Sequence, residues 1–140
     1  AKAEARSAAA ELGARFVEDG LDIETLEGAA TIGLEWLEAT EFPGALLIPL
    51  GNGALFNGVA RVTKARRPAT RTIAVQAAGA PAMVESWRAG RAVVRDRIDT
   101  VADGIGVRVP IPQAIDDMTG LADDAMLVSE DAILAAVRLI

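Results

Sequence analysis

The residues of this chain that most clearly suggest chemistry are two glycines at the end of an apolar run. Gly51 and Gly53 flank Asn52 directly after the run 45–50, and a helical pattern begins immediately beyond them. A glycine pair by itself is more often a plain turn than a binding motif. A buried strand that passes through glycines into a helix N-terminus presents outward-pointing N–H groups and a favourable dipole to an anion. This context predicts a phosphate-binding turn.

Two well-known phosphate motifs do not fit the turn. A dinucleotide-binding motif needs a third glycine where Phe56 stands, and an acid at the end of the next strand, where Gln76 stands. The Gly-Lys-Ser/Thr sequence of a nucleotide-binding P-loop is absent. The turn therefore favours a small phosphorylated ligand whose ester oxygens fill the glycine cup.

The chain contains few groups that could catalyse a reaction. It has no histidine, cysteine or tyrosine, so the usual serine, cysteine and zinc catalytic sites cannot be built from it. Its lysines are Lys2, near the terminus, and Lys64, in a helical stretch. Any general acid or base would have to be a carboxylate. We assign no catalytic residue within the chain.

Composition limits the class of protein and its partners. With 140 residues, of which 51% are hydrophobic, the chain is long enough for one domain with a real core. A net charge of −6 argues against non-specific nucleic-acid binding. No apolar stretch is long enough for a membrane span, and no signal peptide opens the chain. With no cysteine, a cytoplasmic protein is the default expectation.

The order of the predicted elements indicates the fold class. Helical and strand patterns alternate, as they do in a parallel α/β sheet covered by helices. We predict a single domain over residues 1–140, a three-layer α/β/α fold that is Rossmann-like, with a mainly parallel sheet. The predicted strands are 14–17, 45–50, 70–76 and 125–128. The predicted helices are 1–12, 22–39, one from the glycine turn to before Pro68, one from Pro81 to before Gly90, 112–121, and one from Ser129. Residues 91–110 form an irregular excursion.

Details of these elements are specific enough to be checked. Asp22 is placed to cap its helix, and Ser129 to cap the last one. The apolar run 45–50 is typical of a strand covered on both faces. The chain begins inside a helical pattern without a cap and ends within an amphipathic helix without a stop signal. We therefore expect it to be a segment of a longer protein.

Several segments together resemble the fold-type II pyridoxal-phosphate (PLP) enzymes, most closely the branch of threonine dehydratase and serine racemase. The glycine turn, preceded by proline and a small apolar residue and followed by leucine, resembles that family's phosphate loop. Three further segments match in the family's order and approximate spacing, and together they extend the resemblance over nearly the whole chain. They are Gly79–Gly90 (GAPAMVESWRAG), Asp99–Ile105 (DTVADGI) and Asp124–Ile133 (DAMLVSEDAI).

The resemblance implies how the cofactor is held. The cup around its 5′-phosphate would be formed by Gly51, Asn52, Gly53, Ala54 and Leu55, of which Asn52 and Ala54 replace glycines common in the family. Asn52 tolerates left-handed backbone and its amide could reach the phosphate. The turn 102–104 would lie against the cofactor ring, although a simple Asp-Gly turn explains it nearly as well. The family's Schiff-base lysine lies upstream of anything present here, and its contacts to the pyridine nitrogen lie downstream.

A divalent cation site of the family is not expected. Its matching positions are Gln76, Ala80 and Ala82, so two anionic oxygens are replaced, and a hard cation would bind poorly without them. We predict no Mg²⁺ or Ca²⁺ site.

The resemblance implies an activity for the parent protein, and alternatives remain open. The parent would be an oligomeric, cytoplasmic PLP-dependent ammonia-lyase acting on a small hydroxy amino acid, with this chain inactive by itself. One alternative is an amino-acid racemase of the same fold. Another, of a different class, is a non-catalytic phosphate- or nucleotide-binding α/β module, and a third is a segment with no activity of its own. A lysine in an S-x-K-x-R-G-like segment upstream would favour the enzyme.

Overall fold

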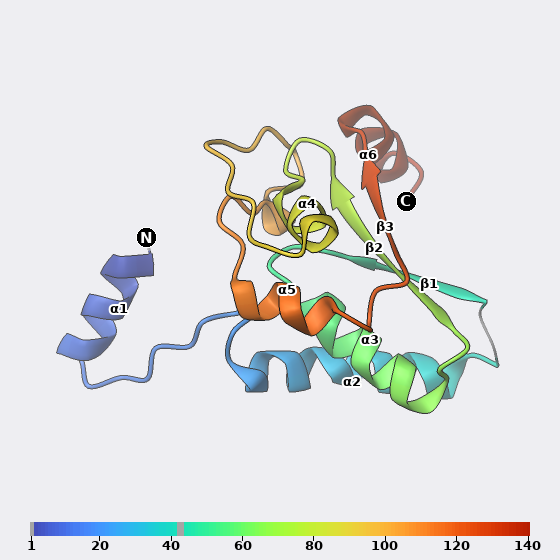
Figure 1. Ribbon diagram of the computed structural model, residues 1–140, viewed down its shortest axis with the longest axis horizontal. Coiled ribbons are helices and arrows are strands. Elements are labelled where there is room, and N and C mark those ends of the chain that lie inside the picture. The colour runs from blue at the N-terminus through green and yellow to red at the C-terminus, as the bar shows by residue number, and fades with distance from the viewer. Residues whose placement is uncertain (1, 42–43) are drawn as a thin grey trace.

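The chain folds around a small parallel sheet. The computed structural model describes residues 2–41 and 44–140 (Figure 1). The three strands lie in the order β1-β2-β3, and both neighbouring pairs are parallel. The predicted α/β class with a parallel sheet is confirmed. In chain order the elements are α1 (Lys2–Glu11), α2 (Ile23–Ala39), β1 (Ala45–Pro49), α3 (Ala54–Arg66), β2 (Arg71–Ala77), α4 (Ala82–Ala89), a 3-10 turn (Asp103–Ile105), α5 (Pro112–Met118), β3 (Asp124–Val128) and α6 (Glu130–Val137).

One face of the sheet carries the hydrophobic core. Each strand contributes a buried residue to it: Ile48, Ala74 and Ala125. Helices α3, α4 and α5 cover this face, because their apolar side chains belong to the same cluster. Those side chains are Phe56, Val59, Ala60, Met83, Val84, Ala114, Ile115 and Met118. Right-handed crossovers between successive parallel strands place the connecting helices on one side, as observed.

The opposite face of the sheet is more open. Leu47 is 56% exposed and Met126 is 45% exposed, although both lie on strands. The prediction that the run 45–50 is covered on both faces is therefore wrong for the described residues, because Ile48 is buried and Leu46 half-buried on one face of β1, whereas Ala45, Leu47 and Pro49 are exposed. Of the three predicted layers, two are described: the sheet, and the layer of helices α3, α4 and α5 on the face that carries the core.

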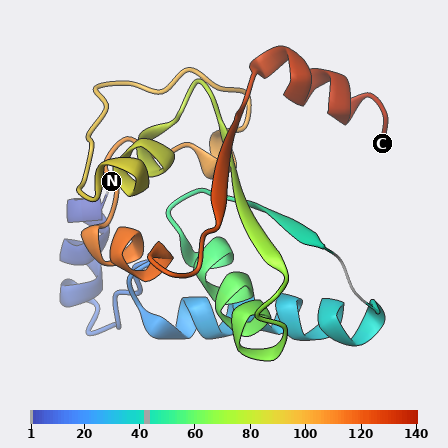
Figure 2. The same cartoon turned by 45° about the vertical axis from the view of Figure 1, so that its right-hand side comes forward.

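Helices α2 and α3 pack closely through glycines. A Cβ added to Gly58 of α3 would lie 2.4 Å from the backbone oxygen of Leu26 and 3.0 Å from the Cβ of Ala29. In return, a Cβ added to Gly33 of α2 would lie 3.3 Å from the backbone oxygen of Val59. Gly33 is one of the buried residues of α2, together with Leu26 and Leu37. The two helices lie side by side below the sheet (Figure 2).

Two predictions for the segment before α2 are wrong. Residues 14–17 form no strand, since they pair with no other strand in the described part of the chain. Asp22 occupies the N-cap position of α2, but its side chain does not cap the helix. Its carboxylate instead accepts a hydrogen bond of 2.6 Å from the backbone N–H of Glu18 and so closes the preceding turn.

The other predicted elements are confirmed with small shifts at their ends. Helix α3 ends at Arg66, before Pro68, and α4 ends at Ala89, followed by the C-cap residue Gly90, whose φ of +64° is left-handed. Ser129 caps α6, because its hydroxyl accepts a hydrogen bond from the N–H of Ala132. Residues 91–110 are irregular apart from the 3-10 turn. The predicted first helix is α1, with Ala1 outside the described residues.

An ion pair ties together the amino ends of β2 and β3. Lys64 donates hydrogen bonds to the Asp123 carboxylate at 2.5 Å and to the backbone oxygen of Thr70 at 3.0 Å. The same carboxylate accepts from the backbone N–H of Thr72 at 2.6 Å. Partial burial alone would raise the pKa of Asp123, but the hydrogen bonds from Lys64 and Thr72 outweigh it and hold the pKa below its usual value.

Substitution of Gly58 by alanine should strongly destabilise the protein. The added methyl group meets helix backbone that cannot move aside without separating α2 from α3, so we expect a loss of roughly 1–3 kcal/mol in the free energy of unfolding. Gly28→Ala is the matched control, because nothing lies within 4 Å of its added Cβ. The control should gain up to about 1 kcal/mol from helix propensity. Chemical denaturation measures both, and equal effects would contradict the packing described.

The ion pair at Asp123 should make stability depend on acid. Because the folded protein lowers this pKa, the carboxylate stabilises the fold above its ordinary pKa of 3.8, and this contribution disappears as the pH falls through the lowered value. Asp123→Asn should therefore give a flatter loss of stability below that pH, measured by denaturation across acid pH. Lys64→Met, which removes the partner, should flatten the profile in the same way. A profile unchanged in both variants would contradict the assignment.

Candidate phosphate-binding site

The glycine turn lies where the sequence places it, between the carboxyl end of β1 and the first turn of α3. Gly53 is the N-cap residue of α3, with a φ of +110° that favours glycine. An added Cβ there would also lie 3.1 Å from the Cβ of Ala114 and 3.1 Å from Nδ2 of Asn57. No non-glycine residue among those described has a positive φ. Asn52 thus does not use the left-handed backbone considered for it, and Ala54 fits in ordinary helical backbone.

The turn offers hydrogen-bond donors that the protein does not use. Within the described residues, no acceptor lies opposite the backbone N–H groups of Gly51, Asn52, Gly53 and Leu55. The first helical bond of α3 is donated by Asn57 to the backbone oxygen of Gly53 at 2.8 Å. Unpaired N–H groups at a helix N-terminus are the donors that a phosphate group accepts from.

A cavity of about 390 Å³ opens beside the turn. Three segments that are distant in sequence form its walls: the glycine turn, the beginning of α2 with the loop before it, and the segment 104–107. Four residues of the predicted cup line the cavity, namely Gly51, Asn52, Ala54 and Leu55. The fifth, Gly53, is buried beneath it.

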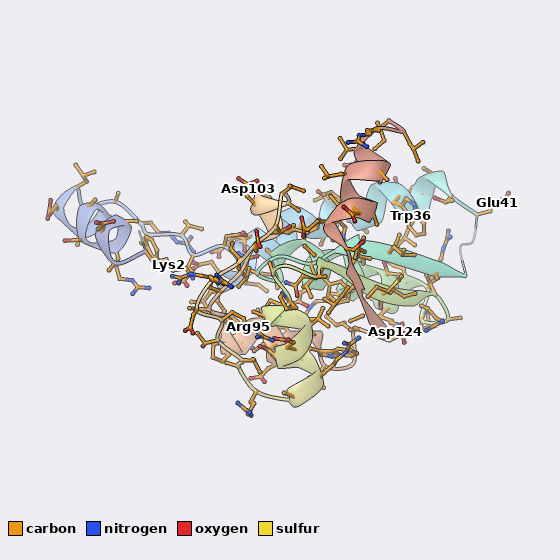
Figure 3. All side chains as sticks on the ribbon, turned by 90° about the horizontal axis from the view of Figure 1, so that it is seen from above. Lys2, Trp36, Glu41, Arg95, Asp103 and Asp124 are labelled. Carbon is orange, nitrogen blue, oxygen red and sulfur yellow. The ribbon has the colours of Figure 1, made fainter. Side chains whose placement is uncertain are left out.

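The segment 99–107 meets the glycine turn at close range. A Cβ added to Gly51 would lie 3.3 Å from Cα of Ile105, so glycine at this position lets the two backbones approach. Gly104 and Ile105 line the cavity, and Ala102 begins the 3-10 turn that carries them. Figure 3 shows Asp103 toward the end of the sheet where the strands finish, whereas Asp124 marks the beginning of β3. Two of the segments that carry the family resemblance are therefore neighbours in space.

The other two segments hold this wall in place. Asp99 donates its backbone N–H to the oxygen of Gly79 at 2.9 Å, and a Cβ on Gly79 would lie 1.7 Å from the oxygen of Asp99. Glu130, at the start of α6, accepts hydrogen bonds from the Thr100 hydroxyl at 3.1 Å and from the Val101 N–H at 2.9 Å. The sequence alone does not reveal this contact of Glu130, because nothing in the local pattern indicates a partner 30 residues away.

The side chain of Asn52 turns away from the centre of the turn. Its Nδ2 donates to the backbone oxygen of Asp19 at 2.8 Å and to the Asp19 carboxylate at 2.7 Å. Its Oδ1 accepts from the N–H of Ala54 at 3.3 Å. Asp19 also lines the cavity. No signal in the sequence points to Asp19, since the loop that carries it has no motif and lies 33 residues before Asn52.

Neither lysine is among the residues that line the cavity beside the glycine turn. Lys64 lies ten residues, about 15 Å, along α3 from its first residue, and its ammonium is bound at the amino ends of β2 and β3. The cavity lies at the carboxyl end of β1. Lys2 lines a neighbouring cavity together with Asn52, but its ammonium is paired with Glu18 at 2.7 Å. The expectation that the chain supplies no Schiff-base lysine stays a prediction.

The position matching the family's cation site has another role here. Gln76 is fully buried, and its Oε1 accepts the N–H of Val84 at 3.0 Å in the first turn of α4. The oxygen that a cation would need is thus engaged in capping a helix. No cluster of three or more acidic residues suited to a metal ion occurs among the described residues.

Comparison with known proteins identifies the family. The profile of the pyridoxal-phosphate-dependent enzyme family matches residues 1–140. The chain belongs to this family. It is similar to L-threonine ammonia-lyases from Thermotoga maritima (34% identity over 125 residues, 89% of this chain and 31% of that protein) and Geobacter sulfurreducens (35% over 137 residues, 98% and 34%). It spans about a third of the length of these relatives.

Solved structures of the PLP-dependent family share the fold. The processed form of threonine deaminase isoform 2 from Solanum lycopersicum superposes with a TM-score of 0.91 at 31% identity, covering 97% of this chain and 40% of that one. Maize serine racemase gives a TM-score of 0.78 at 30% identity, covering 82% and 36%. The predicted resemblance to the threonine dehydratase and serine racemase branch is confirmed.

Millimolar Mg²⁺ or Ca²⁺ should leave the melting temperature of this chain unchanged. The Gln76 amide is neutral and already hydrogen bonded, and alanines stand at the other two positions, so a hard cation finds no anionic oxygen there. Thermal unfolding with increasing cation measures the effect, and KCl at matched ionic strength is the control. A saturable rise specific to the divalent ions would contradict the prediction.

Proposed function

We propose that the protein containing this chain is a PLP-dependent ammonia-lyase that acts on a small hydroxy amino acid, as a threonine or serine dehydratase does. The observation that carries the proposal is the cavity in which the glycine turn and the segment 104–107 meet, with unpaired amides along one wall. The L-threonine ammonia-lyases named above support the reaction class.

Within that enzyme, this chain holds the phosphate end of the cofactor. The amides of Gly51, Asn52, Gly53 and Leu55 would donate to the phosphate oxygens, and the positive end of α3 would favour their charge. Ala54 completes the cup without adding a side chain that competes for space. When bound, the cofactor supplies the electron sink that eases loss of the α-proton and the β-hydroxyl.

The remaining wall positions this cup. The segment 104–107 covers the cavity next to Gly51, and the bonds of Glu130 to Thr100 and Val101 fix the chain that leads to it. The turn 102–104 is the part of this chain we place against the cofactor ring. A network of backbone contacts of this kind orients a cofactor without moving protons, which agrees with a chain that has no catalytic residue.

The second candidate is an amino-acid racemase of the same fold. Maize serine racemase shares the fold at 30% identity over 82% of this chain. Both candidates require the same phosphate cup.

We further propose that the parent protein is cytoplasmic and homo-oligomeric. Its partner is a small amino acid, and it binds neither nucleic acid nor a membrane. Among the described helices, none has the length and apolar character needed to cross a bilayer.

The chain should bind inorganic phosphate and PLP weakly, and Gly51→Ala should weaken both at least tenfold. The added methyl group meets the backbone of Ile105 and pushes apart the two walls of the cavity. Binding is measured by calorimetry or amide chemical shifts, with Gly28→Ala as the control that leaves the cavity unchanged. Phosphate binding that is equal in both variants would contradict the assigned cup.

Reduction with borohydride tests the assignment of catalytic groups. After incubation with PLP, we expect no stoichiometric labelling of a single lysine and no ammonia release from threonine or serine. Lys2→Arg and Lys64→Arg variants identify the source of any labelling. Stoichiometric modification of either lysine would overturn the view that this chain lacks the Schiff-base residue, and phosphate binding without PLP binding would favour a non-catalytic module.

A further inference from the structure

The side chain of Asn52 bridges two walls of the candidate cavity. Through Nδ2 it holds the loop of Asp19, and through Oδ1 it holds the first amide of α3, that of Ala54. Its carboxamide therefore lies between a carboxylate of the loop before α2 and one of the donors of the cup. Both Asp19 and Asn52 line the cavity.

The orientation of this carboxamide follows from its neighbours. Two oxygens of Asp19 lie within 2.8 Å of one end, and an N–H group lies 3.3 Å from the other. Reversing the amide would set its oxygen against two oxygens and its NH₂ against an N–H, leaving three bonds unmade. Oδ1 is therefore the atom that faces Ala54.

The loop of Asp19 is shaped to receive Asn52. Gly20 has a φ of +83°, and a Cβ there would lie 3.0 Å from Cγ of Asn52 and 3.0 Å from its backbone oxygen. The N–H of Gly20 is itself donated to the Thr25 hydroxyl at 3.3 Å, which ties the loop to the first turn of α2. Asn52 thus packs against a loop that the hydrogen bond from Gly20 to Thr25 fixes to α2.

We propose that Asn52, anchored by Asp19, is a positioning residue that competes with phosphate for the N–H of Ala54. Four amides of the cup have no acceptor among the described residues, and the amide of Ala54 is the one that the protein's own side chain occupies. To use this fifth donor, a phosphate oxygen has to displace Oδ1 of Asn52. The inference rests on the proposed function, because it assigns the role of one side chain toward the same phosphate.

The direction of the effect follows from hydrogen-bond strengths. An N–H donated to a phosphate oxygen forms a charge-assisted bond, which is stronger than the bond to a neutral carboxamide oxygen. Displacement is therefore possible, but part of the gain is lost with the bond that Asn52 gives up. Asp19 increases this loss, since its two contacts hold the carboxamide in place.

Replacing Asn52 should tighten phosphate binding. In Asn52→Ala the amide of Ala54 is free, and the backbone is unstrained because position 52 does not have a positive φ. We expect the dissociation constant for inorganic phosphate to fall about fivefold, because phosphate no longer has to break the neutral hydrogen bond between Asn52 and the Ala54 amide. Pyridoxal, which lacks the phosphate, should bind both proteins equally.

Asp19→Ala separates anchoring from simple charge repulsion. If the Asp19 carboxylate acts through Asn52, its removal tightens phosphate binding in the wild-type background, where only the bond to the backbone oxygen of residue 19 remains, and has no further effect in Asn52→Ala. A carboxylate that only repels the anion would give the same gain in both backgrounds, and that result would overturn the anchoring. Asp19→Asn keeps a side-chain oxygen that accepts from Nδ2 of Asn52. The chemical shift of the Ala54 amide proton should therefore stay as it is in the wild type.

The amide proton of Ala54 reports the competition directly in two-dimensional NMR of the whole chain. Its resonance should move in Asn52→Ala before any phosphate is added, and should respond to phosphate in both proteins, at lower concentration in the variant. Equal or weaker phosphate binding by Asn52→Ala would overturn the proposal while leaving the cup in place. Absence of phosphate binding by every variant would overturn both this proposal and the proposed cofactor role.

Discussion

The contact between α2 and α3 at Gly58 is the constraint on which the candidate site depends. The backbone of α2 approaches so closely that any side chain at Gly58 would displace it. This spacing brings the first turn of α2 and the loop of Asp19 beside the glycine turn that begins α3. A small separation of the helices would widen the cavity along its whole length, since packed interiors transmit such shifts rather than absorb them.

The same principle operates on the other wall. The segment 99–107 has little regular structure, yet it is fixed where backbone meets backbone, at Gly79 with Asp99 and at Gly51 with Ile105. Glu130 adds two hydrogen bonds from a different element. Glycines that look like turn residues in the sequence therefore serve mainly to let distant segments touch, and the site exists because several of these contacts occur together.

The charged side chains near the cavity are engaged within the protein. Lys64 is engaged at the amino ends of the strands, and Lys2 is paired with Glu18. The unpaired hydrogen-bond donors described at the cavity are backbone amides, whose protons are not given up near neutral pH. Asp19 is the acidic side chain that lines the cavity, and Asn52 engages it. The arrangement agrees with membership of the PLP-dependent family and with a segment about a third as long as its relatives.

The sequence by itself determined the local elements and the glycine turn, because apolar periodicity, prolines and glycines act over a few residues. Strands 45–50 and 70–76, the helix between them and the Ser129 cap were predicted closely. Other features were not predicted. Asp22 closes a turn rather than capping its helix, and residues 14–17 pair with no strand among the described residues. Asn52 contacts Asp19, which lies 33 residues earlier in the chain. Only the tertiary structure decided these, since each depends on which backbones the packing of α2 on α3 brings together.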